Sequence, residues 1–281
     1  MAKIEKPKNL ILRLFTLGKS FSTKTFSDNT KKFLLNGLGL FIVVTFTFYV
    51  ENLGEEYETR MKYVDNVKTI SASLESKILY SKAYKEQVDW VAEMYQKQYD
   101  KWEIDSDSIF LDYMEDSEEP DGIWYYSPMA FFTNRDPFNP PQIGFEIFES
   151  GNQDFKLVDP YVTSKISQIN KGADLIYLKK NTNDVEEKMI NQYSEILIKW
   201  ARDNIDITNI MENEFWIENR KYIQKDLELK YILQKRTELW QEAITYHLDE
   251  YIKIVERDKT ILDSVIRIYN QEKYFLYWRV N

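Results

Sequence analysis

The pattern of hydrophobic and polar positions changes abruptly at residues 33–50. This run reads FLLNGLGLFIVVTFTFYV and has no charged residue among its eighteen. As an α-helix it would be about 27 Å long, close to the ~30 Å thickness of a bilayer's hydrocarbon core. A buried helix of a water-soluble domain is the alternative, but such a helix normally carries a polar stripe, which this run lacks. We therefore predict a transmembrane helix at 33–50. Its apolar side chains are those of Phe33, Leu34, Leu35, Leu38, Leu40, Phe41, Ile42, Val43, Val44, Phe46, Phe48 and Val50.

A second pattern follows the span, with apolar side chains every three or four residues from Glu55 to about Glu103. This heptad-like spacing predicts one long helix with a mostly apolar stripe, which we call the seam and which the polar Lys77, Ser81 and Gln98 dilute. Such a helix would be about 70 Å long and must cover its stripe with a partner. Two partners are open: later helices of the same chain, or a second copy of the protein. The seam positions are Tyr63, Val67, Ile70, Leu74, Lys77, Ser81, Tyr84, Val88, Val91, Tyr95, Gln98 and Trp102.

The helical pattern stops in residues 105–143. The stretch 105–121 has eight acidic residues and no basic one, and five of the seven prolines lie between 120 and 141. We predict a loop insertion that is not regular helix, with its aromatic residues capping the end of a helical bundle. An EF-hand is excluded because Phe110 stands where that calcium loop needs glycine. A looser divalent-cation site is left open beside the default of a solvated acidic loop.

Helical spacing returns in the second half of the chain. Asp159 and Pro160 have the pattern of a helix N-cap and first residue. After Gly172 there is neither glycine nor proline for 109 residues. The apolar spacing there predicts helices over about 185–200, 210–233, 239–255 and 261–276, with a break at 203–206. One long, bent helix over 206–257 is an alternative.

Charge is distributed unevenly along the chain. Residues 1–32 carry eight basic and two acidic side chains, a net charge of +6, whereas the other 249 residues carry 29 basic and 44 acidic ones, a net charge of −15. Basic flanks of a span stay in the cytoplasm, so we expect a cytoplasmic tail at 1–32 and an extracytoplasmic, periplasmic domain at 51–281. A cleaved signal peptide is the alternative, but no small-x-small cleavage site follows Val50. We predict an uncleaved, single-pass signal anchor in the inner membrane.

The composition excludes several kinds of chemistry. The chain has no cysteine and one histidine, so a disulfide framework, a thiolate-bound metal and a multi-histidine metal site are all excluded. No phosphate-binding glycine motif and no nucleophile elbow is present. His247 is interpreted as a residue on a partly exposed helix face. We expect no catalytic residue, no metal and no cofactor.

One short motif resembles a known family. The order of basic tail, span, long helix and the pattern F-x-x-F-x-S-G…L-V-D-P-x-V-x-x-x-I is similar to a family of uncharacterised single-pass membrane proteins common in Bacteroidota. The resemblance implies a membrane-anchored helical protein and brings no activity with it. The acidic, proline-rich insertion departs from that family's commoner pattern. The matching residues are Phe145, Ser150, Gly151, Leu157, Val158, Asp159, Val162 and Ile166.

Together these patterns predict an all-α protein with one N-terminal transmembrane helix, a long helix and an antiparallel helical bundle. The expected function is that of a non-enzymatic module that binds another envelope protein, or a second copy of itself, beside the lipid bilayer. Nucleic acid is not an expected partner, since the basic segment adjoins a span. The alternative is a ligand-sensing bundle, with 105–143 lining its site, that signals through another membrane protein.

Overall fold

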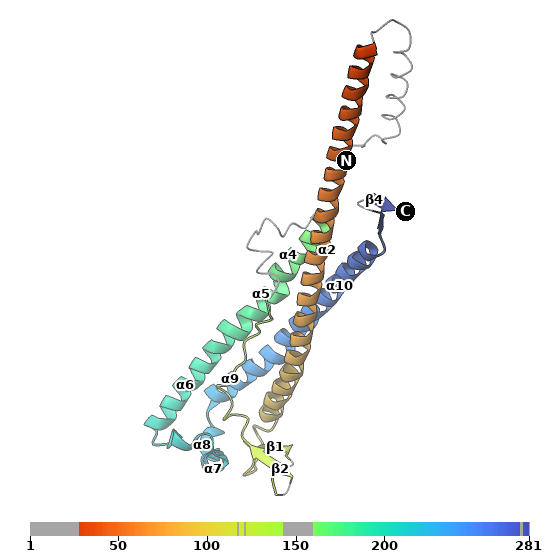
Figure 1. The fold of residues 1–281 in the computed structure, drawn as a ribbon. Helices are drawn as coiled ribbons and strands as arrows, with labels where there is room; N and C mark the ends of the chain where they lie inside the picture. Colours follow the sequence, from red (N-terminus) through yellow and green to blue (C-terminus); the bar gives the residue numbers. More distant parts are fainter. Residues whose placement is uncertain (1–27, 117, 121, 143–159, 276–277, 281) are drawn as a thin grey trace. The chain divides into compact units, whose positions relative to one another are not determined.

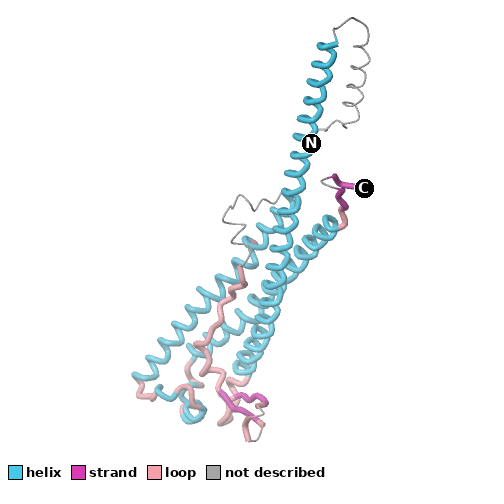
Figure 2. Tube along the Cα trace, viewed as in Figure 1, coloured by secondary structure: helices cyan, strands magenta, loops and turns pink. Residues whose placement is uncertain are grey.

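The computed structural model describes residues 28–280 apart from 117, 121, 143–159 and 276–277. The described chain is mostly helical, which confirms the all-α class (Figures 1 and 2). Two compact units are present, Met1–Thr59 with Tyr274–Asn281, and Arg60–Lys273. Helix α2 (Asp28–Asp100) contributes residues to both units.

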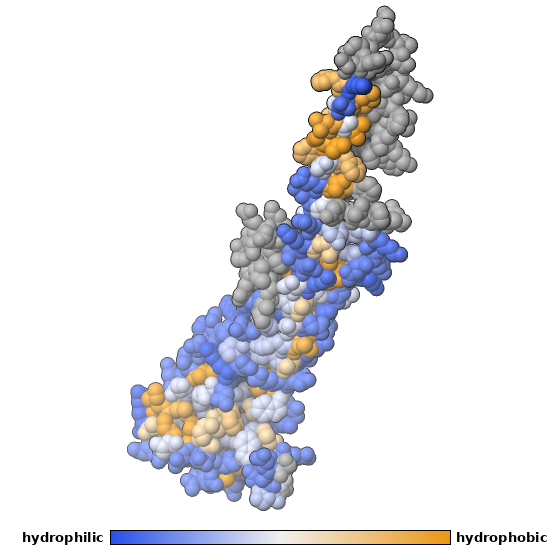
Figure 3. All heavy atoms as spheres, viewed as in Figure 1, coloured by the Kyte–Doolittle hydropathy of each residue, from blue (hydrophilic) through white to orange (hydrophobic). Residues whose placement is uncertain are grey.

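The first unit contains the apolar run. Within α2 this run is long and apolar enough to cross a membrane, and none of its described side chains is buried. Phe33 is 77% exposed and Leu40 is 68% exposed, and hydrophobic residues predominate over this part of α2 in Figure 3. Its two threonines bond backwards to the helix, Thr45 Oγ1 to the Phe41 carbonyl at 2.7 Å and Thr47 Oγ1 to the Val43 carbonyl at 2.9 Å. Their hydroxyls therefore need no hydrogen bond from outside the helix.

The second unit is a helical bundle with three long arms. The first arm is α2 from Arg60 onward. The second is formed by α4 (Pro160–Lys171), α5 (Ala173–Lys180), the π-helical turn η1 (Asn181–Val185) and α6 (Glu186–Arg202). The third is formed by α9 (Leu227–Glu238), the π-helical turn η3 (Leu239–Ile244) and α10 (Thr245–Asn270).

Helices α2 and α10 are antiparallel and are joined by polar contacts along their length. Lys82 Nζ lies 2.7 Å from a Glu256 carboxylate oxygen, and Lys259 Nζ lies 3.0 Å from that of Glu75. The rings of Tyr63 and Tyr269 meet edge to face at 5.4 Å. Residue numbers rise along α2 as they fall along α10, so the two helices run in opposite directions.

The seam is buried inside this one chain. Val67, Ile70, Leu74 and Val88 are completely buried, and even the polar seam positions are 2% exposed or less, while Val91 is half-buried. Of the two partners left open for the stripe, the later helices of the same chain cover it in the structure.

The chain between 206 and 226 differs from both alternatives for this region. It forms the short 3₁₀ turn η2 (Ile207–Asn209) and the short helices α7 (Asn213–Glu218) and α8 (Arg220–Ile223). The long helix begins only at Leu227, where the Asp226 carboxylate accepts hydrogen bonds from the backbone N–H groups of Glu228 and Leu229. Because that cap starts a new helix, one bent helix over 206–257 is wrong. Helix α10 ends at Asn270, so the helix predicted to 276 is too long.

Two short two-stranded sheets also lie outside the sequence prediction. Strands β1 (Asp112–Glu115) and β2 (Ile123–Tyr126) form an antiparallel hairpin within the loop insertion, with Tyr113 opposite Tyr125. Gly122 has φ of 72°, which favours glycine where the chain enters β2. Near the end of the chain, β3 (Lys273–Phe275) pairs with β4 (Trp278–Val280).

Candidate functional site

The residues predicted as an anchor and as a family motif lie in different parts of the chain. The anchor residues lie on α2 and are exposed, except that Val50 is half-buried; the side chain of Leu34 lies outside the described residues. Of the motif, Val162 and Ile166 are buried on α4. Phe145, Ser150, Gly151, Leu157, Val158 and Asp159 lie outside the described residues.

Residues 127–142, which we call the strap, begin with hydrogen-bonded turns at 128–133 and continue without regular secondary structure along the bundle. Figure 2 shows it as a loop leading away from the hairpin between the helical arms. Backbone groups of the strap bond to helix side chains: Tyr84 Oη donates to the Asp136 carbonyl at 2.7 Å, and Phe138 N–H donates to Thr182 Oγ1 at 3.0 Å. Phe132 and Phe138 are completely buried. Phe132 and Phe138 therefore anchor the strap in the core, while residues 133–136 between them are exposed.

A buried ion pair holds the strap against the second and third arms. Arg236 on α9 is 1% exposed and lies 2.7 Å from Glu186 Oε1 at the start of α6, whose side chain is 0% exposed. The same guanidinium donates to the backbone carbonyls of Phe132 and Asn134. Its carbon lies 4.5 Å from the ring centroid of Phe132 and 4.8 Å from that of Tyr95. One side chain thus connects α9, α6, α2 and the strap.

The environment of Glu186 opposes its charge. Burial raises the pKa of Glu186, and the opposing effects of Arg236 and of the Trp240 indole N–H, which donates to Oε1 at 3.1 Å, leave the pKa still above its ordinary value. Within the described residues, Glu186 Oε2 and Arg236 Nε have no hydrogen-bond partner. The pair is therefore costly to bury, and the four elements it joins must stay closely packed.

Two π-helical turns lie next to this ion pair. Turn η1 ends immediately before Glu186, and η3 begins three residues after Arg236 and contains Trp240. The two turns also contact each other. π-helical turns are rare in proteins and occur frequently at functional sites.

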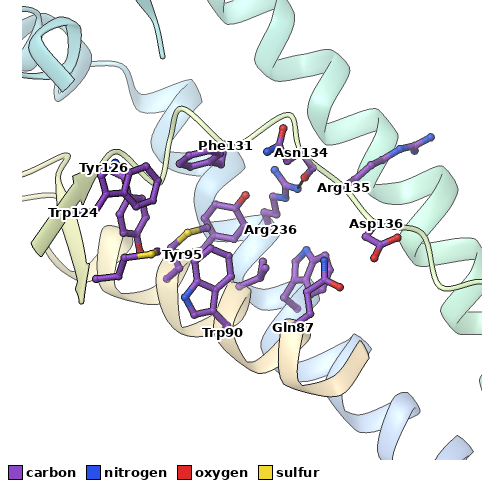
Figure 4. Close-up of a pocket in the computed structure, with 14 residues that line it drawn as sticks. Gln87, Trp90, Tyr95, Trp124, Tyr126, Phe131, Asn134, Arg135, Asp136 and Arg236 are labelled. Atoms are coloured by element: carbon purple, nitrogen blue, oxygen red, sulfur yellow. Dashed lines mark hydrogen bonds between the residues drawn. The ribbon is translucent and has the colours of Figure 1, made fainter. Parts of the chain in front are cut away.

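A pocket of about 330 Å³ opens beside Arg236, between α2, the hairpin, the strap and the third arm. Figure 4 shows Trp124 and Tyr126 of β2 at one end and Asn134 to Asp136 of the strap at the other. Most of the lining is apolar or aromatic. The lining residues are Gln87, Trp90, Val91, Met94, Tyr95, Met114, Trp124, Tyr126, Phe131, Asn134, Arg135, Asp136, Arg236 and Trp240.

The charged groups of the pocket differ in how they are compensated. Arg236 is neutralised by Glu186. Arg135 points away from the pocket (Figure 4), toward the Asn183 carbonyl at 2.8 Å and Glu187 at 3.3 Å. In the part of the chain that the structure describes, the carboxylate of Asp136 has no hydrogen bond or ion pair, and the residue is exposed. The uncompensated charge at the pocket is therefore negative.

His247 on α10 packs against side chains of α5. Its Nδ1 lies 2.7 Å from Asp174 Oδ1, and its ring centroid lies 3.8 Å from that of Tyr177. These contacts join α10 to α5. Among the described residues there is also no group of three or more histidine, aspartate or glutamate side chains placed to hold a metal.

The loop insertion and its aromatic residues were predictable from the sequence, but the ion pair at the centre of the site was not. A signal for Arg236 is present, since Leu229, Leu233, Arg236 and Trp240 recur at four, three and four residues on one helix face. No such signal identifies Glu186 as its partner, because fifty residues separate the two. No protein-family model, curated protein or solved structure matches this chain.

Proposed function

We propose that the chain is a non-enzymatic, membrane-anchored helical module that binds a protein partner in the cell envelope. The observation that carries the proposal is the exposure of the apolar run of α2, in which the described side chains of 33–49 are all exposed. Such a surface is unfavourable in water, at about 25 cal/mol for each Å² of apolar area, and favourable in a bilayer. The +6 charge of residues 1–32 supports a cytoplasmic tail, and hence a helical domain on the periplasmic side of the inner membrane.

The surface proposed for the partner lies away from the seam. The seam is covered within the chain, so it offers no apolar stripe to a second protein. Exposed aliphatic side chains occur instead where α6, α7 and α9 meet, and a hydrophobic area is visible over this end of the second unit in Figure 3. We use the name distal patch for the exposed side chains of Ile198, Met211, Ile217 and Leu227, which are 51%, 58%, 41% and 73% exposed. Their neighbours in sequence join the elements: the Trp200 ring on α6 contacts that of Trp216 on α7, and Lys199 on α6 pairs with Asp226 at the start of α9. Exposed apolar groups of this kind mark interaction surfaces when they lie close together.

Affinity capture of the full chain from mildly solubilised membranes tests the proposal. We expect one envelope protein to be recovered in stoichiometric amount, and the double variant Ile198→Glu/Leu227→Glu to lose it. The matched control is Leu79→Glu, which changes an exposed leucine on α2 outside the distal patch. Capture that is unchanged in the double variant would exclude this surface, and recovery of no partner would contradict the proposal.

A second candidate function is ligand sensing, with the signal passed to another membrane protein. The pocket beside Arg236 is the specific observation in its favour. The strap forms one wall of the pocket and is held by the same guanidinium that joins α6 to α9. A ligand that contacts the strap would therefore also act on the packing of the helical arms.

A further inference from the structure

We infer that the pocket beside Arg236 binds a small organic cation, with an apolar ring among the aromatic side chains and an ammonium group near Asp136. This inference rests on the second candidate function, that of ligand sensing, and specifies the chemical class of the ligand. It is independent of the protein partner proposed for the distal patch.

The aromatic lining favours a ligand that has both an apolar ring and a positively charged group. Trp90, Tyr95, Trp124, Tyr126 and Phe131 face the pocket (Figure 4). The faces of such rings carry negative electrostatic potential, so they attract cations as well as apolar groups. The contacts of Arg236 with Tyr95 and Phe132 show the same preference inside the protein itself.

The charged residues that line the pocket also favour a cationic ligand, because the basic ones already have ion-pair partners and the acidic one has none in the described part of the chain. An anionic ligand would gain little from Arg236, because Glu186 already neutralises its charge and both terminal amino groups of the guanidinium already donate to Glu186 and two carbonyls. Arg135 is engaged with Glu187 on α6. Among the charged residues that line the pocket, Asp136 is the one without an ion pair within the described residues, and the chain beyond residue 32 carries a net charge of −15.

The size of the pocket limits the ligand to a small molecule. Its volume of about 330 Å³ is at the lower end of the usual range for small-molecule sites, which is roughly 300–1,000 Å³. Trp90 is 46% exposed, so the site is open to solvent on the side of α2. One fused ring system with a short aminoalkyl chain matches these dimensions.

Binding can be measured by fluorine NMR on the full chain, solubilised in detergent and labelled with 5-fluorotryptophan. The probes are three molecules that share the indole ring and differ in charge: tryptamine, indole and indole-3-acetate. Three of the seven tryptophans, Trp90, Trp124 and Trp240, line the pocket. The buried Trp102, Trp200 and Trp216 do not line it and provide internal controls against uptake of the probes by micelles.

We expect tryptamine to shift the signals of Trp90 and Trp124 while those of Trp102, Trp200 and Trp216 stay in place. Tryptamine should bind roughly three- to tenfold more tightly than indole-3-acetate, as a partly exposed ion pair and cation–π contacts provide. Asp136→Asn should lower the affinity for tryptamine to about that for indole. Glu195→Gln, an exposed carboxylate on α6, should leave them unchanged.

Two further variants alter the shape of the pocket. Val91→Phe places a larger side chain on its wall and should weaken all three probes at least tenfold, whereas Leu79→Phe on the exposed face of the same helix should have no effect. Trp90→Ala removes one exposed wall and should weaken binding without disturbing the buried tryptophan signals. These unchanged signals report that each variant is folded.

The outcomes separate the ligand class from the proposed sensing function. If indole-3-acetate binds as tightly as tryptamine, the inferred cation is wrong while the pocket remains a binding site. Two results would contradict both the inference and the second candidate function. In the first, none of the three probes shifts the signals of Trp90 or Trp124. In the second, Val91→Phe binds the probes as tightly as the parent does.

Discussion

At the residue scale, Arg236 makes several different kinds of contact at once. Its guanidinium contacts a carboxylate, two carbonyls and two aromatic rings, and these groups belong to three elements besides its own helix α9: α6, α2 and the strap. A planar group with five N–H donors can satisfy several acceptors at once, which lysine cannot. The position of the strap, and hence of the pocket wall, depends on this side chain.

Replacing Arg236 with methionine should lower the unfolding free energy by about 3–5 kcal/mol, because it leaves Glu186 buried without its partner. Urea denaturation of the full chain in mild detergent, followed by circular dichroism, measures the change. The control is Arg267→Met on α10, an exposed arginine. A loss no greater than that of the control would show that the ion pair does not hold the strap.

The raised pKa of Glu186 gives the pair a defined pH dependence. The folded chain binds a proton at Glu186 more readily than the unfolded chain does, so this group stabilises the fold as pH falls through its raised pKa towards the ordinary value of 4.5. The unfolding free energy of the parent, relative to that of Glu186→Gln, should therefore rise between neutral pH and about pH 4.5. A difference that falls, or that stays constant over this range, would contradict the raised pKa.

One residue of the buried ion pair could be predicted from the sequence, and its partner could not. The spacing of Leu233, Arg236 and Trp240 places an arginine on an apolar helix face, which is visible in the sequence. Its partner Glu186 lies fifty residues earlier, and only the packing of α6 on α9 brings the two together. The pocket is absent from the sequence for the same reason, since its walls come from α2, the hairpin, the strap and the third arm.

At the element scale, the long helix and its seam follow from the sequence, and the loop insertion follows only in part. The seam was predictable because each buried position repeats the helical period over many turns. The strap has no period of its own. Its conformation depends on side chains such as Tyr84 and Thr182, which lie on helices distant in sequence.

The intrachain packing of the seam can be tested with cysteine variants, since the natural chain has no cysteine. Leu74→Cys and Val88→Cys should react slowly with maleimide and form no disulfide-linked dimer, because both positions are completely buried. Leu79→Cys, 62% exposed on the same helix, should react rapidly. Rapid dimer formation by Leu74→Cys would indicate that a second copy covers the seam.

At the scale of the whole molecule, an apolar segment exposed on all sides is combined with a folded helical unit of acidic character. The segment was predictable because its signal is local: eighteen residues without charge, between a basic and an acidic flank. The interior of the folded unit was less predictable, because π-helical turns and buried ion pairs result from contacts between distant residues. The pocket and the distal patch, the two surfaces proposed for binding, likewise result from contacts between distant residues.

The proposed topology is tested most directly by labelling single cysteines in cells with a membrane-impermeant maleimide. Glu195→Cys, on the exposed face of α6, should be labelled once the outer membrane is permeabilised, whereas Lys8→Cys should be labelled only after the inner membrane is disrupted. The mature chain should retain Lys8→Cys, as an uncleaved anchor requires. Labelling of Lys8→Cys with the inner membrane intact, or protection of Glu195→Cys under the same conditions, would contradict the account.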